Sequence, residues 1–160
     1  MQYMHNLNDL NLLLNKGKID FKFLSKSEDD TKNLALTIAK NLNNNDIIVL
    51  NGELGSGKTC FMQGVAKYFD IEKQICSPTF TIVNEYLTKN NQNIYHFDVY
   101  RLEDETDFID GIGTDYFDNG ICFIEWGNII KKILPKRTIY IDFEKDENEY
   151  NTRYIHIWRK

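Results

Sequence analysis

Residues 47–59 read IIVLNGELGSGKT. Gly52 to Thr59 has the spacing of a phosphate-binding loop (P-loop): Gly, four residues, Gly, Lys and then Ser or Thr. The glycines let backbone N–H groups close around phosphates, Lys58 adds positive charge, and the Thr59 hydroxyl can bind Mg²⁺ carried by a nucleotide. Residues 46–50 are typical of a buried strand, and residues 60–68 can continue as a helix. Because a P-loop needs this context, the sequence predicts a nucleoside triphosphate site rather than an ordinary glycine-rich turn.

Helix and strand patterns alternate along the rest of the chain. Ser27 is expected to cap a helix whose first turn is acidic and whose apolar residues repeat at helical spacing up to Leu42. Polar turns separate two pairs of strand-like runs, which predicts two hairpins. The first hairpin joins residues 81–87 to 93–99, and the second joins residues 138–143 to 150–158. Further expected elements are a buried strand at 121–125, a helix at 128–134 stopped by Pro135, and a loop with a short helix at 103–118.

These patterns predict an α/β fold: a single P-loop NTPase-like domain with a central, mainly parallel sheet, antiparallel hairpin additions and helices on both faces. A length of 160 residues, 42% of them hydrophobic, suits one domain with a real core. Residues 1–26 are expected to form an N-terminal extension and residues 27–160 the P-loop domain. Met1 to Leu14 is rich in Asn and Leu and lacks the basic start of a targeting peptide.

Composition also limits the compartment and the partners. The net charge of −5 argues against an autonomous nucleic-acid surface, so any RNA contact is expected to be shared with a partner. No apolar run reaches the roughly 18–20 residues that cross a bilayer, and we expect no membrane partner. Three cysteines without a CxxC pair fit a reducing, cytoplasmic location. For Cys60, helix packing is favoured over redox control.

Two acidic residues are candidates for the chemistry beside the P-loop. Asp98 and Glu125 each end an apolar run, and the carboxyl ends of strands form the edge at which open α/β sheets bind ligands. Each is favoured as a ligand of the metal or of the attacking water over a simple turn cap, but the sequence does not assign which does which. Trp126 can stack on a nucleobase or be an ordinary aromatic. His96, inside a strand, is favoured as a structural histidine over a general base.

The nucleotide is expected to be ATP. GTPases read guanine with an Asn-Lys-x-Asp element after the P-loop, and nothing after residue 59 supplies that element. No metal site of the His/Cys type is visible in the sequence.

Four separated motifs resemble, in order and spacing, those of the bacterial TsaE (YjeE) family. They are Gly52 to Thr59, Ser77-Pro78-Thr79-Phe80, His96 to Leu102, and Ile124-Glu125-Trp126. That family is the small ATPase of the machinery that makes threonylcarbamoyladenosine in tRNA, and the resemblance spans roughly residues 27–158. Two positions depart from the family: Cys60 stands where Thr or Ser is usual, and Gly127 where Pro is frequent.

The resemblance implies a role for each matching residue. Residues 27–160 would be a P-loop ATPase domain that uses ATP and Mg²⁺. Asp98 and Glu125 would be the catalytic acidic pair, with Thr59, Asp98 and Glu125 near the metal, and residues 77–80 would be a mobile switch segment. The expected nucleotide-binding residues are Thr31, Glu53, Leu54, Gly55, Ser56, Gly57, Lys58, Thr59, Cys60 and Trp126, with Trp126 against the adenine.

The resemblance also implies partners. The protein would act with TsaB and TsaD homologues, meet tRNA only through that complex, and support the threonylcarbamoyl transfer by its ATP cycle. Two other classes stay open on the residues alone. A small P-loop metabolite kinase would bring arginine-rich lid and acceptor sites, whereas only Arg101 of the four arginines is expected near the active edge. A nonhydrolysing, nucleotide-gated interaction module is the second alternative.

Overall fold

The strand that precedes the P-loop lies in the middle of a seven-stranded sheet. The computed structural model describes residue 3, residues 6–78 and residues 81–160. The strands are β1 (Ile19–Ser25), β2 (Ile47–Asn51), β3 (Val83–Leu87), β4 (Asn93–Asp98), β5 (Ile121–Glu125), β6 (Ile139–Lys145) and β7 (Arg153–Arg159). The helices are α1 (Leu7–Leu14), α2 (Glu28–Lys40), α3 (Lys58–Tyr68) and α4 (Glu105–Gly111), with the 3₁₀ helices η1 (Asp115–Asp118) and η2 (Gly127–Ile133).

The sheet combines a parallel core with antiparallel edges, as predicted. Its strand order is β1-β7-β6-β2-β5-β4-β3. Strands β6, β2, β5 and β4 are parallel to their neighbours in this row. Strand β3 adds antiparallel to β4, β7 to β6, and β1 to β7. Both predicted hairpins, β3–β4 and β6–β7, are therefore confirmed.

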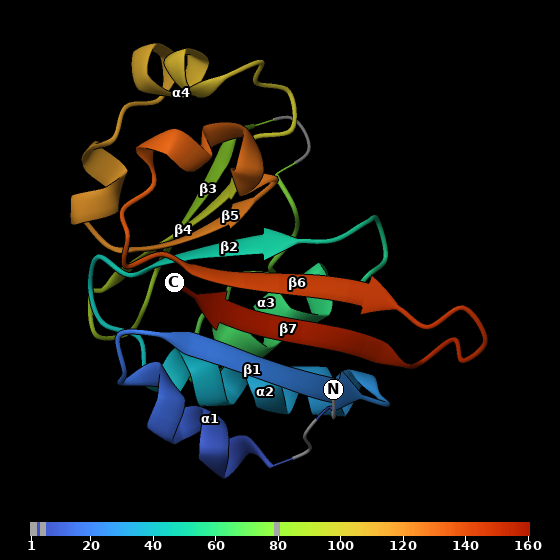
Figure 1. The fold of residues 1–160 in the computed structure, drawn as a ribbon. Helices are drawn as coiled ribbons and strands as arrows, with labels where there is room; N and C mark the ends of the chain where they lie inside the picture. Colours follow the sequence, from blue (N-terminus) through green and yellow to red (C-terminus); the bar gives the residue numbers. More distant parts are fainter. Residues whose placement is uncertain (1–2, 4–5, 79–80) are drawn as a thin grey trace.

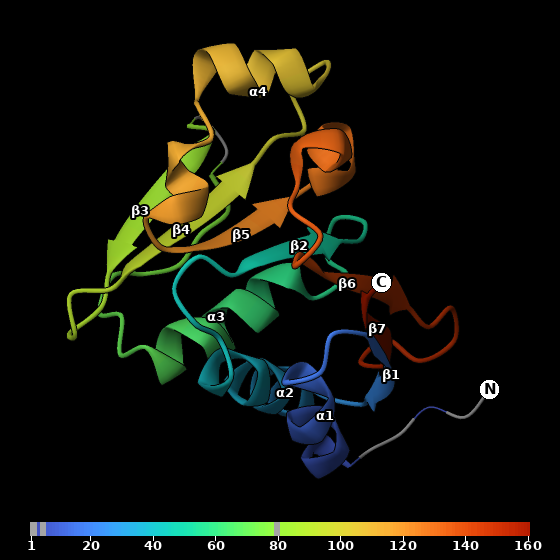
Figure 2. The same ribbon diagram turned by 60° about the vertical axis from the view of Figure 1, so that its left-hand side comes forward.

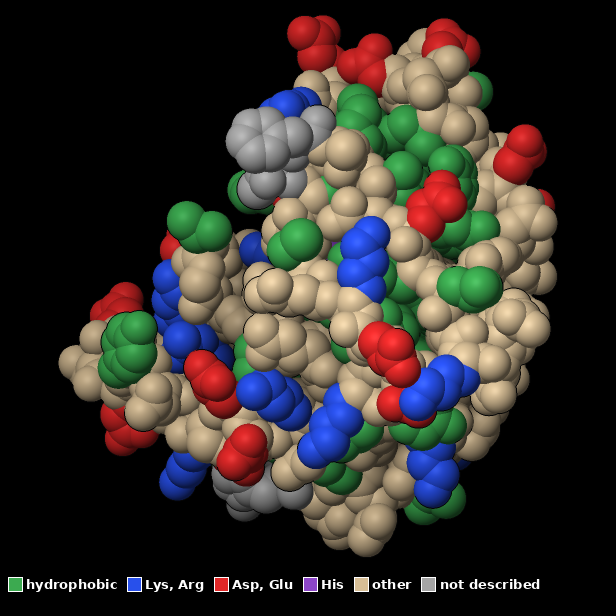
Figure 3. All heavy atoms as spheres, turned by 180° about the vertical axis from the view of Figure 1, so that it is seen from behind, with side chains coloured by type: hydrophobic (Ala, Val, Ile, Leu, Met, Phe, Trp, Pro, Cys, Tyr) green, Lys and Arg blue, Asp and Glu red, His purple; other side chains and the backbone are tan. Residues whose placement is uncertain are grey.

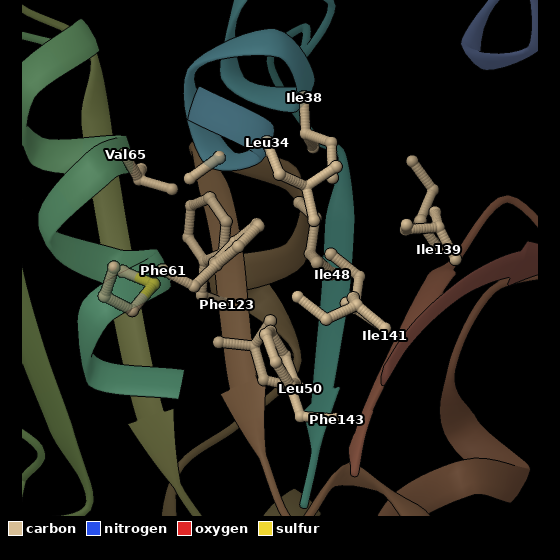
Figure 4. Packing of buried hydrophobic residues seen from close by; sticks show 14 of the residues in the cluster. Leu34, Ile38, Ile48, Leu50, Phe61, Val65, Phe123, Ile139, Ile141 and Phe143 are labelled. Atoms are coloured by element: carbon tan, nitrogen blue, oxygen red, sulfur yellow. The ribbon is translucent and has the colours of Figure 1, made fainter. Parts of the chain in front are cut away.

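Helical segments cover both faces of the sheet (Figures 1 and 2). Helices α1, α2 and α3 lie on one face, and α4, η1 and η2 lie on the other. The side chains of β2 alternate between these layers, with Ile48 in the same apolar cluster as α2 and α3, and Val49 in the opposite cluster. Figure 4 shows the first cluster, in which Leu34 and Phe61 reach toward the sheet. Burial on both faces explains why β2 is a continuous apolar run.

Helices α2 and α3 pack closely at a glycine, which gives a stability prediction. A Cβ on Gly64 would lie 2.7 Å from Ala35 Cβ and 2.7 Å from Lys32 O. We expect Gly64→Ala to lower the free energy of unfolding by about 1–3 kcal/mol, because overpacking outweighs the better helix propensity of Ala. Urea unfolding measures this change. The control is Gly111→Ala in α4, where a Cβ meets no atom within 4 Å. An unfolding free energy that stays equal or rises in Gly64→Ala would contradict the packing argument.

The N-terminal part of the chain, expected to be an extension, contains α1 and β1. Every residue of β1 pairs with β7, and its burial alternates so that Ile19, Phe21 and Phe23 face the core. Leu10 of α1 is fully buried in the same cluster as α2. These contacts join α1 and β1 to the sheet and to the apolar cluster of the P-loop unit, and the domain boundary at residue 27 stays a prediction.

Two other segments take short helical forms. The predicted helix at 128–134 is the 3₁₀ helix η2, whose Ile130 has non-helical backbone angles. The acidic segment 103–118 contains α4 and η1. Among the described residues, no helix has the length and apolar character required to cross a membrane.

Candidate active site

Three strand ends meet in register beside the P-loop. In the parallel ladders, Leu50 of β2 is the partner of Glu125 of β5, and Glu125 is the partner of Asp98 of β4. The P-loop begins two residues after Leu50, so the two acids end their strands next to it. This is the carboxyl edge of the parallel core, where open α/β sheets bind ligands.

The P-loop backbone needs its glycines. Gly55 and Gly57 have φ angles of 73° and 113°, in the left-handed region that favours glycine. A Cβ on Gly52 would lie 2.4 Å from Ser56 Oγ and 2.9 Å from Phe143 O, so no larger residue fits there. Helix α3 then starts at Lys58 without a side-chain cap, which leaves N–H groups of its first turn for an anion.

The site is a cavity of about 650 Å³, within the range of small-molecule sites. Every residue expected from the sequence to bind the nucleotide or to act in catalysis lines this one cavity: Thr31, Glu53, Leu54, Gly55, Ser56, Gly57, Lys58, Thr59, Cys60, Asp98, Glu125 and Trp126. Its wall also includes residues that the sequence did not single out for the site: Glu28, Gln63, Tyr100, Tyr150, Asn151 and Arg153.

The amine of Lys58 is directed at the P-loop itself. Its Nζ donates to the carbonyl of Gly52 and, over 3.3 Å, to the carbonyl of Glu53. The charge of the ammonium also favours the ionised form of both acids of the site, although burial outweighs it at Asp98 and keeps the pKa of that carboxyl raised. The Lys58 ammonium therefore contacts the loop and acts on both carboxylates through its charge.

The two acids have different environments. Burial raises the pKa of Asp98 above its usual range, although its Oδ1 accepts a hydrogen bond from the Tyr100 N–H at 3.3 Å. Glu125 is only 3% exposed, and burial acts to raise the pKa of its carboxyl. The imidazole of His96, the charge of Lys58 and the Ser77 hydroxyl outweigh burial and hold the pKa of Glu125 below its ordinary value. The different surroundings thus shift the pKa values of two carboxylates at the same edge of the sheet in opposite directions.

His96 is a neighbour of Glu125 rather than a satisfied core histidine. Its Nε2 lies 3.5 Å from Glu125 Oε2, longer than an ordinary hydrogen bond. Among the described residues, neither ring nitrogen of His96 has a hydrogen-bond partner. The ring is nevertheless buried beside Glu125, and a structural role rather than that of a general base stays the prediction for His96. The alternation His96-x-Asp98 was the available signal, since residues two apart on a strand share a face.

The predicted switch segment begins at the acidic pair. Ser77 Oγ donates to Glu125 Oε2 over 3.2 Å, so this segment contacts the site through its first residue. Pro78 is buried. Thr79 and Phe80, the other two residues of the predicted switch, lie outside the described residues.

Three further predicted residues are placed around the cavity. The hydroxyl of Thr31 is 2.8 Å from that of Ser25 and shares a hydrogen bond with it. Cys60 Sγ donates to the Glu28 carbonyl at 3.4 Å, and burial raises the pKa of this thiol, which favours a packing role over a reactive thiolate. Trp126 has a φ of 63° and is 52% exposed at the cavity wall.

The β6–β7 hairpin brings two cations to the P-loop that the sequence did not reveal. Lys145 Nζ donates to the carbonyl of Leu54 at 2.6 Å, and Arg153 Nη2 donates to that of Gly55 at 3.3 Å. The expectation that Arg101 alone lies near the active edge is wrong, because Arg153 lines the cavity and Arg101 is not among its lining residues. Arg101 donates to the hydroxyl of Tyr100, which does line it.

The donors suit a nucleotide-bound Mg²⁺. Thr59, Asp98 and Glu125 offer hydroxyl and carboxylate oxygens on one cavity, and Mg²⁺ prefers such oxygens, completed by phosphate and water. In the described part of the chain, no group of three or more His, Cys, Asp or Glu side chains could hold a metal ion. The Thr59 hydroxyl and the two carboxylates fit a metal that arrives with the phosphates.

Comparisons with known proteins agree on one family. A family model described as "Threonylcarbamoyl adenosine biosynthesis protein TsaE" matches residues 25–155. The chain is 39% identical over 123 residues to a tRNA threonylcarbamoyladenosine biosynthesis protein TsaE of Rickettsia conorii, covering 76% of this chain and 70% of that protein. It is 35% identical over 131 residues to the protein of the same name from Bacillus subtilis, covering 80% and 82%. The crystal structure of YdiB from Bacillus subtilis is similar with a TM-score of 0.64 and 28% identity, over 89% of this chain and 86% of that one.

Proposed function

Because this chain belongs to the TsaE family of tRNA threonylcarbamoyladenosine biosynthesis proteins, we propose that it binds ATP with Mg²⁺ and hydrolyses it. The observation that carries this proposal is the register of β2, β5 and β4, which sets Glu125 and Asp98 beside the P-loop. A P-loop binds the phosphates, and two carboxylates at the adjacent strand ends supply what hydrolysis needs beyond binding.

Binding is assigned to the P-loop and the start of α3. Backbone N–H groups of residue 55 and residues 57–59 would surround the β- and γ-phosphates, and the Lys58 ammonium would turn from the carbonyls of Gly52 and Glu53 to phosphate oxygens. Thr59 would offer its hydroxyl to the magnesium ion. Trp126, exposed at the cavity wall, is proposed to lie against the adenine.

Hydrolysis is assigned to the acidic pair. One of Asp98 and Glu125 would help to hold the metal through its carboxylate, and the other would orient the attacking water. Bound Mg²⁺ supplies neutralisation of the charge that develops on the phosphates. Ser77, through its hydrogen bond to Glu125, would connect the state of this site to the switch segment.

The proposed partners are TsaB and TsaD homologues in the cytoplasm, with tRNA bound only through their complex. Figure 3 shows Lys and Arg side chains interspersed with Asp and Glu over one face of the molecule, without a continuous basic field. The net charge of −5 points the same way, since phosphate backbones demand a basic surface. Chemistry on the tRNA is therefore assigned to the partners.

A reconstitution tests the function. Phosphate release from ATP is measured for this protein alone and with purified TsaB and TsaD, and threonylcarbamoyladenosine in tRNA is measured by mass spectrometry of nucleosides. We expect weak hydrolysis alone, faster hydrolysis in the mixture, and repeated rounds of tRNA modification only when this protein and ATP are present. Absence of phosphate release under all conditions would favour a nonhydrolysing module, and phosphate transfer to a metabolite would identify a kinase.

A further inference from the structure

The two cations of the β6–β7 hairpin share a defined geometry. Lys145 and Arg153 are direct partners in the antiparallel ladder of β6 and β7, and opposed residues of such a ladder point to the same face. Lys145 reaches the carbonyl of Leu54, and Arg153 reaches that of Gly55. The pairing of β6 with β7 thus places two charged donors at two successive carbonyls of the P-loop. We call Lys145 and Arg153 the carbonyl clamp.

Arg153 is held in place for this contact. Its Nη1 donates to the carbonyls of Tyr150 at 2.6 Å and Thr152 at 2.8 Å, which anchors the guanidinium to its own hairpin. The hairpin also packs against the back of the loop, since a Cβ on Gly57 would lie 3.8 Å from Phe143 and 4.0 Å from Arg153 Cγ. The contact therefore comes from a braced element, not from a lone flexible side chain.

Holding a carbonyl fixes the N–H on the far side of the same peptide. The described residues contain no cis peptide bond, and in a trans peptide the C=O and the next N–H point in opposite directions. The Leu54 carbonyl shares its plane with the N–H of Gly55, and the Gly55 carbonyl with the N–H of Ser56. Both peptides lie in a loop whose glycine φ angles allow other orientations.

Resting on the proposed function, the geometry points to a further role: the carbonyl clamp positions the P-loop for phosphate. By holding the carbonyls of Leu54 and Gly55, Lys145 and Arg153 fix the orientation of both peptides before ATP arrives. The N–H of Gly55 is thereby directed toward the bound phosphates, whereas the N–H of Ser56 donates within the loop to the Glu53 carbonyl at 3.0 Å. A preorganised loop loses less conformational freedom on binding, so the clamp raises nucleotide affinity without contacting the reacting atoms. Lys145 and Arg153 are thus positioning residues for ATP and for ADP alike.

Substitution of each clamp residue tests the role. From the loss of a charge-assisted hydrogen bond, we expect Arg153→Met to weaken ATP and ADP binding by roughly 10-fold. For Lys145→Met we expect the binding of both nucleotides to weaken by roughly 3-fold, because the Lys145 side chain is exposed. Both nucleotides should weaken by the same factor while kcat at saturating ATP stays constant, and Arg153→Lys should recover part of the affinity. Calorimetry gives the binding constants, and thermal unfolding checks the fold.

The controls separate this role from others. Lys89→Met removes a lysine of the β3–β4 hairpin that pairs with Asp70, away from the cavity, and should leave affinity unchanged. Unchanged affinity in both clamp variants would overturn the proposal, and so would a loss confined to kcat, which indicates direct contact with the transition state. If Arg153→Met unfolds, the affinity of Lys145→Met tests the proposal instead, because the contact of Lys145 with the Leu54 carbonyl is exposed and its loss should leave the fold intact.

Failure of the proposed function would be visible separately. Wild-type protein that bound neither nucleotide would refute ATP binding and leave the clamp open to a direct measurement. Hydrogen exchange of the Ser56 amide in nucleotide-free protein provides it, because its hydrogen bond to the Glu53 carbonyl depends on the orientation of the peptide that Arg153 holds. We expect faster exchange in Arg153→Met and Lys145→Met than in wild type, and equal rates would refute the clamp.

Discussion

Lys58→Met is expected to weaken ATP binding by roughly 100-fold or more. The variant keeps a side chain of similar length and removes the cation, so phosphates lose a charge-assisted hydrogen bond of about 1.5–3 kcal/mol in addition to a longer-range attraction. The loss extends to the acids of the site, because the charge of Lys58 favours the ionised form of Glu125 and, to a smaller extent than burial opposes it, that of Asp98. Without this cation, two carboxylates face the incoming phosphates with less compensation.

Calorimetric titration with ATP and Mg²⁺ measures the effect. The matched control is Lys67→Met, an exposed lysine in the last turn of the same helix that does not line the cavity. We expect the control to bind ATP as wild type does. An affinity of Lys58→Met within about threefold of wild type, about 0.65 kcal/mol, would show that the P-loop does not bind the phosphates as proposed.

Glu125→Gln is expected to keep ATP binding and to lose hydrolysis by roughly 10²–10⁴-fold, the usual range for a general acid–base group. The amide has nearly the same volume in this buried position, and its oxygen can still accept the hydrogen bond of Ser77. It carries no charge for a metal ion and cannot take a proton from water. The expected variant therefore holds ATP without turning it over.

Single-turnover phosphate release and nucleotide affinity are measured in parallel, with and without partners. Glu144→Gln on β6 is the control, because Glu144 is exposed and does not line the cavity. Asp98→Asn is measured beside it to divide the roles. The variant that needs more Mg²⁺ identifies the metal-binding acid, and the one that loses rate at saturating Mg²⁺ identifies the acid that orients water. Normal hydrolysis by Glu125→Gln would remove Glu125 from the mechanism.

Local patterns predicted the parts of this site that are close in sequence. The P-loop spacing, the apolar run of β2 and the hairpin turns each act within about ten residues, and the structure agrees with all three. The places of Asp98 and Glu125 could be predicted because each is an acidic residue at the end of an apolar strand, although 27 positions separate the two in the sequence. Because parallel strands have their carboxyl ends at one edge of the sheet, no further sequence signal was needed to expect these two ends close together.

Contacts between distant segments could not be predicted in the same way. Lys145 and Arg153 are ordinary surface cations in the sequence, and their meeting with Leu54 and Gly55 depends on the pairing of β6 with both β2 and β7. The pairing of the segment before residue 27 also depends on a distant part of the chain. Ile19, Phe21 and Phe23 alternate as a strand should, but the strand signal has meaning only once β7 provides a partner.

The pairing of β1 with β7 has a consequence for synthesis of the chain. The ribosome synthesises β1 (Ile19–Ser25) first and β7 (Arg153–Arg159) much later, because all the other strands of the sheet lie between them in the chain. Until β7 follows, β1 has an unpaired edge, and the P-loop lacks the Arg153 contact. Contacts between segments this distant in sequence slow folding, because the entropy of closing the long loop is lost before the contacts stabilise the chain. The P-loop thus gains its contact with Arg153 only after β7 has been synthesised, and a chain truncated before β7 carries the P-loop without that contact.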